Sequence, residues 1–273
     1  MSEKTWMAKI RHQLNTFLGA VVFLTRIPVG SLYVFRAEEL PRSAVYFPAV
    51  GSLIGFLAGA VLFCTQPVLP GIVAVLLCML TTVLVTGALH EDGLADAVDG
   101  LAGGSTPGER LAIMKGSTVG VYGVVALWFS LTAKLLLLGS LLERGTKVAF
   151  CALIVANGMG RAGTVALLFA CPYVREGESK ASAFAHGITR GEFVLSLLLP
   201  IVLAVVFLGH DGFACICCAA VAVWAAAVFF RKMIGGITGD CLGATNQLIE
   251  LLCYLLLAGR FAPAMRILEK QNG

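Results

Sequence analysis

Seven apolar stretches, each close to the length that crosses a lipid bilayer, constrain the fold of this chain more than any other feature of its sequence. They contain few charged residues and are separated by short polar segments. The hydrocarbon core of a bilayer requires about 20 mostly apolar residues per helix. An all-α, polytopic transmembrane helical bundle of about seven spans is therefore predicted. The predicted spans are Ala44 to Thr65, Gly71 to Leu89, Val119 to Leu142, Val148 to Ala170, Phe193 to Leu208, Phe213 to Phe230 and Leu242 to Ala258.

The composition supports a membrane protein and excludes several other classes. Hydrophobic residues make up 58% of the 273 residues and charged residues only 13%, against about a quarter charged in ordinary soluble domains. The net charge of +4 is too small for a nucleic-acid-binding surface, so no nucleic-acid partner is expected. The nine cysteines form no Cys-x-x-Cys pair, so neither a zinc site nor a disulfide framework is indicated. We expect a single membrane domain over residues 1–273, without internal repeats.

The N-terminal segment predicts a helix at the membrane surface. Arg11 to Gln13 interrupt any signal-peptide core, and no cleavage site follows. The apolar segment from Thr16 to Pro28 is too short to span, so we interpret it as interfacial or re-entrant. From Trp6 into the start of this segment, apolar side chains recur near helical spacing, as expected for an amphipathic helix. They are Trp6, Ile10, Leu14 and Phe17.

Basic residues in the short connections predict the orientation of the spans. Cytoplasmic segments carry an excess of Lys and Arg, whereas the turn from Gln66 to Pro70 has no charge. The bias places the N-terminal side and the segments 91–115, 172–192 and 231–241 in the cytoplasm. Arg144, Lys147 and the basic residues after 259 do not fit this orientation if the last span crosses fully.

The most informative motif is His90-Glu91-Asp92-Gly93-Leu94-Ala95-Asp96-Ala97-Val98-Asp99-Gly100, directly after the second predicted span. Asp92, Asp96 and Asp99 are spaced i, i+4, i+7, which places them on one face of a helix. A divalent cation such as Mg²⁺ or Mn²⁺, which takes oxygen ligands and bridges them to phosphates, would stabilise that cluster. The alternative is an acidic helix start whose aspartates cap the helix and complement its dipole.

A second polar region opens the last predicted span. The glycine-rich loop Gly235-Gly236-Ile237-Thr238-Gly239-Asp240 offers backbone N–H groups that can bind an anion. Asp240 and Gln247 share one helix face at i, i+7. Glu250 lies deep in an apolar run, where an ionisable group usually faces a functional cavity.

Other cations have both functional and structural interpretations. Arg161, at i+4 from Asn157 within the fourth span, suits a phosphate or a guanine base, because its planar fork makes paired hydrogen bonds. Alternatively, Arg161 and Glu250 form an ion pair between helices. Lys134 is either functional or extended towards the membrane surface. Arg175 meets an anionic substrate or serves only the charge bias of the loops.

On these residues the chain resembles the cobalamin synthase family, the adenosylcobinamide-GDP ribazoletransferases of the late corrinoid pathway. The resemblance extends in order over most of the chain, and its acidic motif is long and specific. It rests on the motif from His90 to Gly100, on Thr25-Arg26-Ile27-Pro28, on Phe47-Pro48 with Gly51, on Asn157 to Arg161 and on Gly235 to Ala244.

The resemblance implies a Mg²⁺-dependent enzyme of the bacterial cytoplasmic (inner) membrane, with its active site facing the cytoplasm. Such an enzyme joins α-ribazole, or α-ribazole 5′-phosphate, to adenosylcobinamide-GDP and releases GMP. Asp92, Asp96 and Asp99 would be catalytic and hold the metal. Substrate binding would fall to Glu91, Lys115, Arg161, Arg175, Gly236, Thr238, Gly239, Asp240, Gln247 and Glu250. A homo-oligomer is compatible with the sequence.

Two rival classes and one departure accompany this resemblance. Asp96-Ala97-Val98-Asp99-Gly100 matches part of the motif of CDP-alcohol phosphotransferases, but the rest of that motif is absent. A small-solute transporter would also bury ionisable groups, although no paired broken helices or repeats are visible. Where the cobalamin synthase family often has Met-Lys-Asp-Ser-Arg, this chain has Met114-Lys115-Gly116-Ser117-Thr118.

Overall fold

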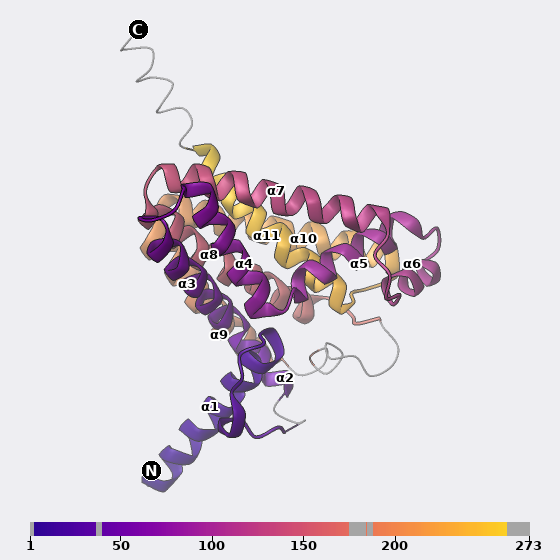
Figure 1. The fold of residues 1–273 in the computed structure, drawn as a ribbon. Coiled ribbons are helices and arrows are strands. Elements are labelled where there is room, and N and C mark those ends of the chain that lie inside the picture. Colours follow the sequence, from indigo (N-terminus) through magenta and orange to yellow (C-terminus); the bar gives the residue numbers. More distant parts are fainter. Residues whose placement is uncertain (1–2, 37–39, 175–183, 185–187, 261–273) are drawn as a thin grey trace.

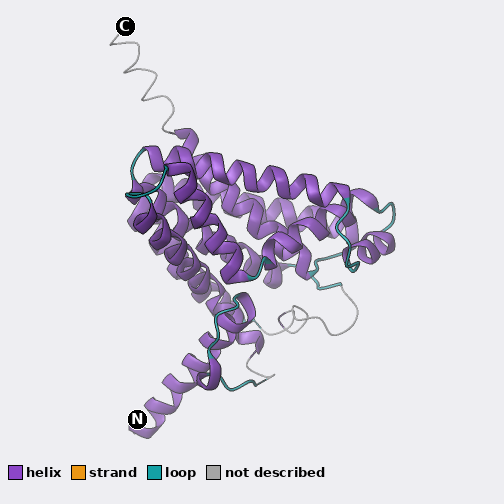
Figure 2. Ribbon diagram, viewed as in Figure 1, coloured by secondary structure: helices purple, strands orange, loops and turns teal. Residues whose placement is uncertain are grey.

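The protein is a bundle of α-helices in a computed structural model that describes residues 3–36, 40–174, 184 and 188–260. Apart from one isolated parallel bridge between Tyr173 and Ile237, the regular elements of this part are all helical (Figures 1 and 2). The prediction of an all-α fold is confirmed. The helices are α1 (Glu3–Leu24), α2 (Leu40–Ser43), α3 (Phe47–Thr65), α4 (Gly71–Thr86), α5 (Leu89–Gly103), α6 (Pro107–Met114), α7 (Val121–Glu143), α8 (Thr146–Ala170), α9 (Arg190–Leu208), α10 (His210–Ile234) and α11 (Gly239–Arg260), with short 3-10 turns at Gly30–Leu32 and Ala44–Tyr46.

Six helices in the described ranges are long and apolar enough to cross a membrane, and a bent pair of helices raises that number to seven. This agrees with the predicted count of about seven. The central helix is α8, whose most apolar window is 89% buried within the protein, whereas the windows of α7, α9 and α10 are 17–28% buried. The apolar faces of these three outer helices are left for lipid, which is the arrangement of a multi-pass membrane protein.

The second predicted span differs from its prediction. The helix α4 ends at Thr86 and not at Leu89, and the chain then bends by 85° into α5. Gly87 and Ala88 both adopt left-handed backbone conformations, with φ of +63° and +58°. This break directs the acidic motif sideways, so that α5 packs against α7 and α11 within the bundle.

Glycines allow two close helix crossings that position the site. A Cβ atom on Gly55 of α3 would lie 2.3 Å from the Leu153 carbonyl oxygen of α8. A Cβ on Gly93 of α5 would lie 3.1 Å from Cα of Gly243 in α11. Such approaches require residues without a side chain. The second crossing brings the acidic motif directly beside the start of α11.

The N-terminal prediction is modified by the structure. The amphipathic segment and the first part of the short apolar segment, up to Leu24, form one continuous helix, α1, which projects from the bundle (Figure 1). Trp6, Ile10 and Leu14 on this helix are exposed, as an interfacial helix requires. The helix is not among those that meet the length and hydropathy requirements for a span.

Candidate active site

A cavity of about 640 Å³ opens where α1, the α4–α5 break, α5, α8 and α11 meet. This volume is within the range of small-molecule sites, which are mostly apolar with a few placed polar groups. Aromatic side chains in the wall include Phe23, Tyr33, Phe35 and Phe47. The polar side chains in the wall are Thr25, Arg26, Thr86, His90, Asp92, Thr164, Tyr173 and Asp240.

Two carboxylates line this cavity from adjoining helices. Asp92 lies in the first turns of α5 and Asp240 in the first turn of α11. The glycine crossing holds these backbones together, because a Cβ on Gly93 would lie 3.3 Å from Cα of Asp240. The Thr238 hydroxyl donates to Asp240 Oδ2 at 3.4 Å and accepts from the Cys241 N–H, which caps α11. The N-terminus of α11, with its partial positive charge, therefore faces the same cavity.

The third aspartate of the motif points elsewhere. Asp99 is buried, and its two oxygens accept the backbone N–H groups of Gly120 and Gly123 at 2.7 and 2.8 Å. It thereby caps the N-terminus of α7. Asp96 is half-buried and is not part of the cavity wall. In the described ranges, no group of three His, Cys, Asp or Glu side chains is placed to hold a metal ion, so the expected three-aspartate cluster does not form as such.

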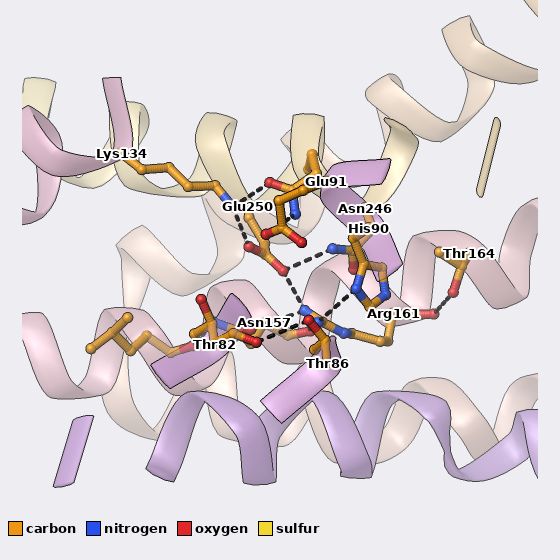
Figure 3. A network of polar contacts seen from close by, with 12 residues as sticks. Thr82, Thr86, His90, Glu91, Lys134, Asn157, Arg161, Thr164, Asn246 and Glu250 are labelled. Atoms are coloured by element: carbon orange, nitrogen blue, oxygen red, sulfur yellow. Dashed lines mark hydrogen bonds and ion pairs between the residues drawn. The ribbon is translucent and has the colours of Figure 1, made fainter. Parts of the chain in front are cut away.

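The deep polar residues form a buried charge cluster, which we define as Lys134, Arg161, Gln247 and Glu250. Figure 3 shows Lys134, Arg161 and Glu250 of this cluster pointing toward one another. Glu250 pairs with Arg161 through one oxygen and with Lys134 through the other, the latter at 2.6 Å. Lys134 also donates to Gln247 Oε1 at 2.5 Å. The alternative in which Arg161 and Glu250 pair across helices is therefore the arrangement observed. Lys134 is inside the bundle and does not extend to the membrane surface.

This cluster reaches the cavity through two contacts. Gln247 donates to Glu91 Oε1 at 3.0 Å, on the first turn of α5. His90 lines the cavity, and its Nδ1 lies 3.4 Å from Nη2 of Arg161. A guanidinium nitrogen always donates, so Nδ1 is the acceptor and the remaining proton is on Nε2. Arg161 itself is 2% exposed and outside the cavity wall.

The remaining predicted residues have varied positions. Lys115 is exposed at the end of α6 and does not line the cavity. A Cβ on Gly236 would lie 2.2 Å from the Pro172 carbonyl oxygen, and that oxygen accepts the Ile237 N–H. This part of the glycine-rich loop is thus used in packing, whereas Gly239 lines the cavity. Arg175 lies outside the described residues.

The short helix α6 has a complete capping box that fixes the chain after the acidic motif. The Thr106 hydroxyl accepts the Glu109 N–H, and the Glu109 carboxylate accepts the N–H groups of Ser105 and Thr106. These backbone hydrogen bonds lower the pKa of Glu109. Arg110 extends from the same helix to the Met233 carbonyl oxygen at the end of α10, at 2.9 Å.

Arg26 is a charged cavity residue to which the sequence assigned no role. Arg26 follows α1 in Thr25-Arg26-Ile27-Pro28. This segment supported the family resemblance, but no catalytic or binding role was predicted for it. The Arg26 side chain lines the cavity together with Asp92 and Asp240. A single arginine two residues before a proline gives no signal of its own, because its position depends on the hydrogen bond between the segment after α1 and Val85 near the end of α4.

A bundle of helices long and apolar enough to cross a membrane, with a cavity lined by two carboxylates and an arginine, defines a multi-pass membrane protein with a charged internal cavity. Comparison with known sequences gives the particular family. The cobalamin-5-phosphate synthase family matches residues 16–258, and the chain belongs to this family.

Relatives at about 40% identity support the same family. The adenosylcobinamide-GDP ribazoletransferase of Shewanella woodyi is 38% identical over 255 residues, covering 93% of this chain and 99% of the relative. Those of Shewanella frigidimarina and Shewanella baltica are 39% and 40% identical, each over 90% of this chain and 94% of the relative. No solved structure matches. The comparisons favour the cobalamin synthase resemblance over the CDP-alcohol phosphotransferase and transporter alternatives.

Proposed function

We propose that this chain is an adenosylcobinamide-GDP ribazoletransferase that acts at the cavity lined by Asp92 and Asp240. Family membership supports the activity, and the pair of cavity carboxylates is the observation that favours this cavity as its site. A ribose hydroxyl of α-ribazole, or of its 5′-phosphate, attacks the phosphorus that carries the corrinoid. The bond from that phosphorus to the GMP oxygen breaks, GMP leaves, and the new phosphodiester gives adenosylcobalamin or its 5′-phosphate.

The cavity residues fit a Mg²⁺ ion that is shared with the substrate. Mg²⁺ is usually held by one or two carboxylates together with substrate phosphates and water, and not by an all-protein cage. Asp92 and Asp240 would hold it, and the bound ion would neutralise negative charge on the phosphate oxygens. One of these two carboxylates accepts the proton of the attacking hydroxyl. Asp96 and Asp99, expected as further ligands, are outside the cavity wall.

The size of the cavity indicates which part of the substrate it receives. A volume of about 640 Å³ suits a nucleotide, whereas a corrinoid macrocycle with its amide side chains is much larger. The corrinoid would remain at the mouth, where Phe35 is 66% exposed and Tyr33 is also part of the wall. In this arrangement the reacting diphosphate lies between the nucleotide inside and the corrinoid outside.

The test is GMP release from adenosylcobinamide-GDP and α-ribazole by purified protein in liposomes, with and without Mg²⁺. Asp92→Asn and Asp240→Asn should lower kcat by about a hundredfold or more, as losing an electrostatic stabiliser of a transition state does. Glu143→Gln, an exposed carboxylate at the far end of α7, is the matched control and should retain activity. A folded wild type that releases no GMP would overturn the proposal.

A further inference from the structure

Arg26 is a cation in the cavity that the proposed chemistry does not yet use. Its backbone is fixed on two sides. The Arg26 N–H donates to the Val85 carbonyl oxygen at 2.7 Å. On the other side, the Thr25 hydroxyl donates to the Val21 carbonyl oxygen at 2.7 Å and accepts the Ile27 N–H at 3.2 Å. Among the residues that the structure describes, no carboxylate forms an ion pair with the Arg26 guanidinium.

The side chain of Arg26 lies across Gly87 at the break between α4 and α5. A Cβ on Gly87 would lie 2.4 Å from Nε, 2.9 Å from Cγ and 3.2 Å from Cδ of Arg26. The left-handed φ of +63° at Gly87 favours glycine independently. Gly87 therefore both makes the bend and leaves the space in which the arginine lies, and the start of α5, with Asp92, follows at once.

The charges around the cavity are suited to a diphosphate. Arg26 and the N-terminus of α11 supply positive charge, and Asp92 and Asp240 supply negative charge for a divalent cation. A diphosphate can bind a guanidinium on one side and a carboxylate-held cation on the other. The arginine fork makes paired, charge-assisted hydrogen bonds with phosphate oxygens, which a lysine cannot reproduce.

We propose that Arg26, held in place by Gly87, binds the diphosphate of the nucleotide substrate in the cavity. That this diphosphate belongs to a nucleotide rests on the proposed function, whereas the match of Arg26, Asp92 and Asp240 to a diphosphate with a divalent cation rests on the cavity itself. Arg26 is a substrate-binding residue in this proposal, and Gly87 is a positioning residue that acts through it.

The first test measures binding of GDP with Mg²⁺ to the full-length protein in nanodiscs, together with KM and kcat for GMP release. Arg26→Gln should weaken GDP binding by about ten- to a hundredfold, because a hydrogen bond to a charged group contributes about 1.5–3 kcal/mol. Arg26→Lys should recover only part of this loss. Arg190→Gln, an exposed arginine at the start of α9 and outside the cavity wall, is the matched control and should bind as the wild type does.

The second test separates the position of Arg26 from backbone strain. Gly87→Ala should weaken GDP binding in the same direction as Arg26→Gln, and combining the two should add little. Gly209→Ala is the control, because Gly209 also has a positive φ (+56°, with ψ of −125°), a conformation still less accessible to alanine than the left-handed one of Gly87, and nothing lies within 4 Å of its Cβ position. It introduces the strain without displacing the arginine, so GDP binding should be retained.

The outcomes distinguish this inference from the proposed function. GDP binding that depends on Arg26, with no ribazole transfer by the wild type, supports the diphosphate site and overturns the transferase. Ribazole transfer and GDP binding that both survive in Arg26→Gln overturn the inference and leave the transferase intact. A wild type that does not bind GDP, or equal effects of Gly87→Ala and Gly209→Ala on binding, also overturns it.

Discussion

At the scale of single residues, Asp92 and Asp99 lie on the same helix but have different surroundings. Asp92 is exposed in the cavity, whereas Asp99 is 6% exposed and bound to two backbone N–H groups of α7. A carboxylate at a helix N-terminus satisfies free donors and complements the helix dipole. A Cβ on Gly120 or Gly123 would lie within 2.5 Å of an Asp99 oxygen, so the cap also depends on these glycines.

This difference predicts opposite effects of two identical substitutions. Asp99→Asn should lower the free energy of unfolding by about 1–2 kcal/mol, in the range of a lost helix cap, because an amide replaces one acceptor with a donor. Asp92→Asn should leave stability unchanged and abolish most GMP release. Thermal unfolding in detergent, followed by light scattering, measures the first effect. Equal stability of the two variants would contradict the capping role.

The buried charge cluster contains two cations, Lys134 and Arg161, around the single carboxylate of Glu250. All three side chains are less than 10% exposed. Charges in such a place are tolerated only when they are paired and hydrogen-bonded. Asn246 completes the coordination of Glu250 with a hydrogen bond of 2.9 Å.

The order of severity of substitutions in this cluster follows from its charges. Glu250→Gln leaves two buried cations without a counter-charge and should destabilise the protein by about 3–5 kcal/mol. Lys134→Met should cost less, because Arg161 and Glu250 remain paired. The double variant should be more stable than the sum of the single effects predicts. Unfolding by titration with sodium dodecyl sulfate measures all three, and strict additivity would show that Lys134 and Glu250 are not coupled.

The sequence predicted some of these residues for sound reasons and others only in part. The free-energy cost of burying a charge identified Glu250 and Arg161 as unusual and left Lys134 open, but periodicity cannot say whether such groups face one another or a cavity. The i, i+4, i+7 spacing placed three aspartates on one face. That spacing could not show that α7 begins beside Asp99, whose carboxylate binds the backbone N–H groups of α7 and does not line the cavity with Asp92.

At the scale of elements, α3 and α8 make the tightest crossing among those positioning the site. Gly51 and Gly55 lie against the Asn157 and Leu153 carbonyl oxygens, with Cβ positions 2.4 and 2.3 Å away. Small residues at helix interfaces let backbones approach closely in membranes, where packing drives association. The α8 helix that carries Arg161 is fixed in this way.

A pair of glycine substitutions tests this crossing. Gly55→Ala places a methyl group against backbone atoms and should destabilise the protein by at least the roughly 1–3 kcal/mol of an overpacked core. Gly139→Ala, within α7, has nothing within 4 Å of its Cβ position. This control should be neutral or stabilising by up to about 1 kcal/mol from helix propensity. Unfolding in detergent compares them, and a neutral Gly55→Ala would contradict the tight crossing.

The apolar runs predicted six helices as single elements, with ends that differ by a few residues. The apolar runs did not predict the bend between α4 and α5, because Thr86-Gly87-Ala88 continues an apolar run and a single glycine is not a specific signal for a bend. The bend depends on left-handed conformations at both Gly87 and Ala88. The cavity follows from this bend, and so the sequence predicted the acidic motif but not the space beside it.

At the scale of the whole molecule, several connections meet at one end of the bundle. The Thr146 hydroxyl, after α7, donates to Gln66 after α3 at 3.4 Å. Arg144 donates to the Leu257 and Ala258 carbonyl oxygens near the end of α11. The cavity lies towards the other ends of these helices, where α11 begins and α5 follows the break.

This arrangement gives a structural role to Arg144, one of the two cations after α7 that fit the orientation rule poorly. Arg144 is partly buried and bonded to the carbonyl groups at the end of a neighbouring helix. A cation in this position stabilises the end of a helix dipole. The charge of Arg144 therefore stabilises the end of α11, and its position need not follow the excess of Lys and Arg on the cytoplasmic side.

The predicted orientation can be tested with single cysteines in a version of the protein whose nine cysteines are replaced. Gln66 and Lys115 are both exposed, and they lie near opposite ends of α7, whose 23 residues extend about 35 Å. We expect an impermeant maleimide to label Gln66→Cys in intact cells and Lys115→Cys only after permeabilisation, because the basic segments favour the cytoplasm. Labelling in the reverse pattern would overturn the orientation but leave the transmembrane placement of α7 intact. Labelling of both positions from one side would show that α7 does not cross the bilayer, whose hydrocarbon core is about 30 Å thick.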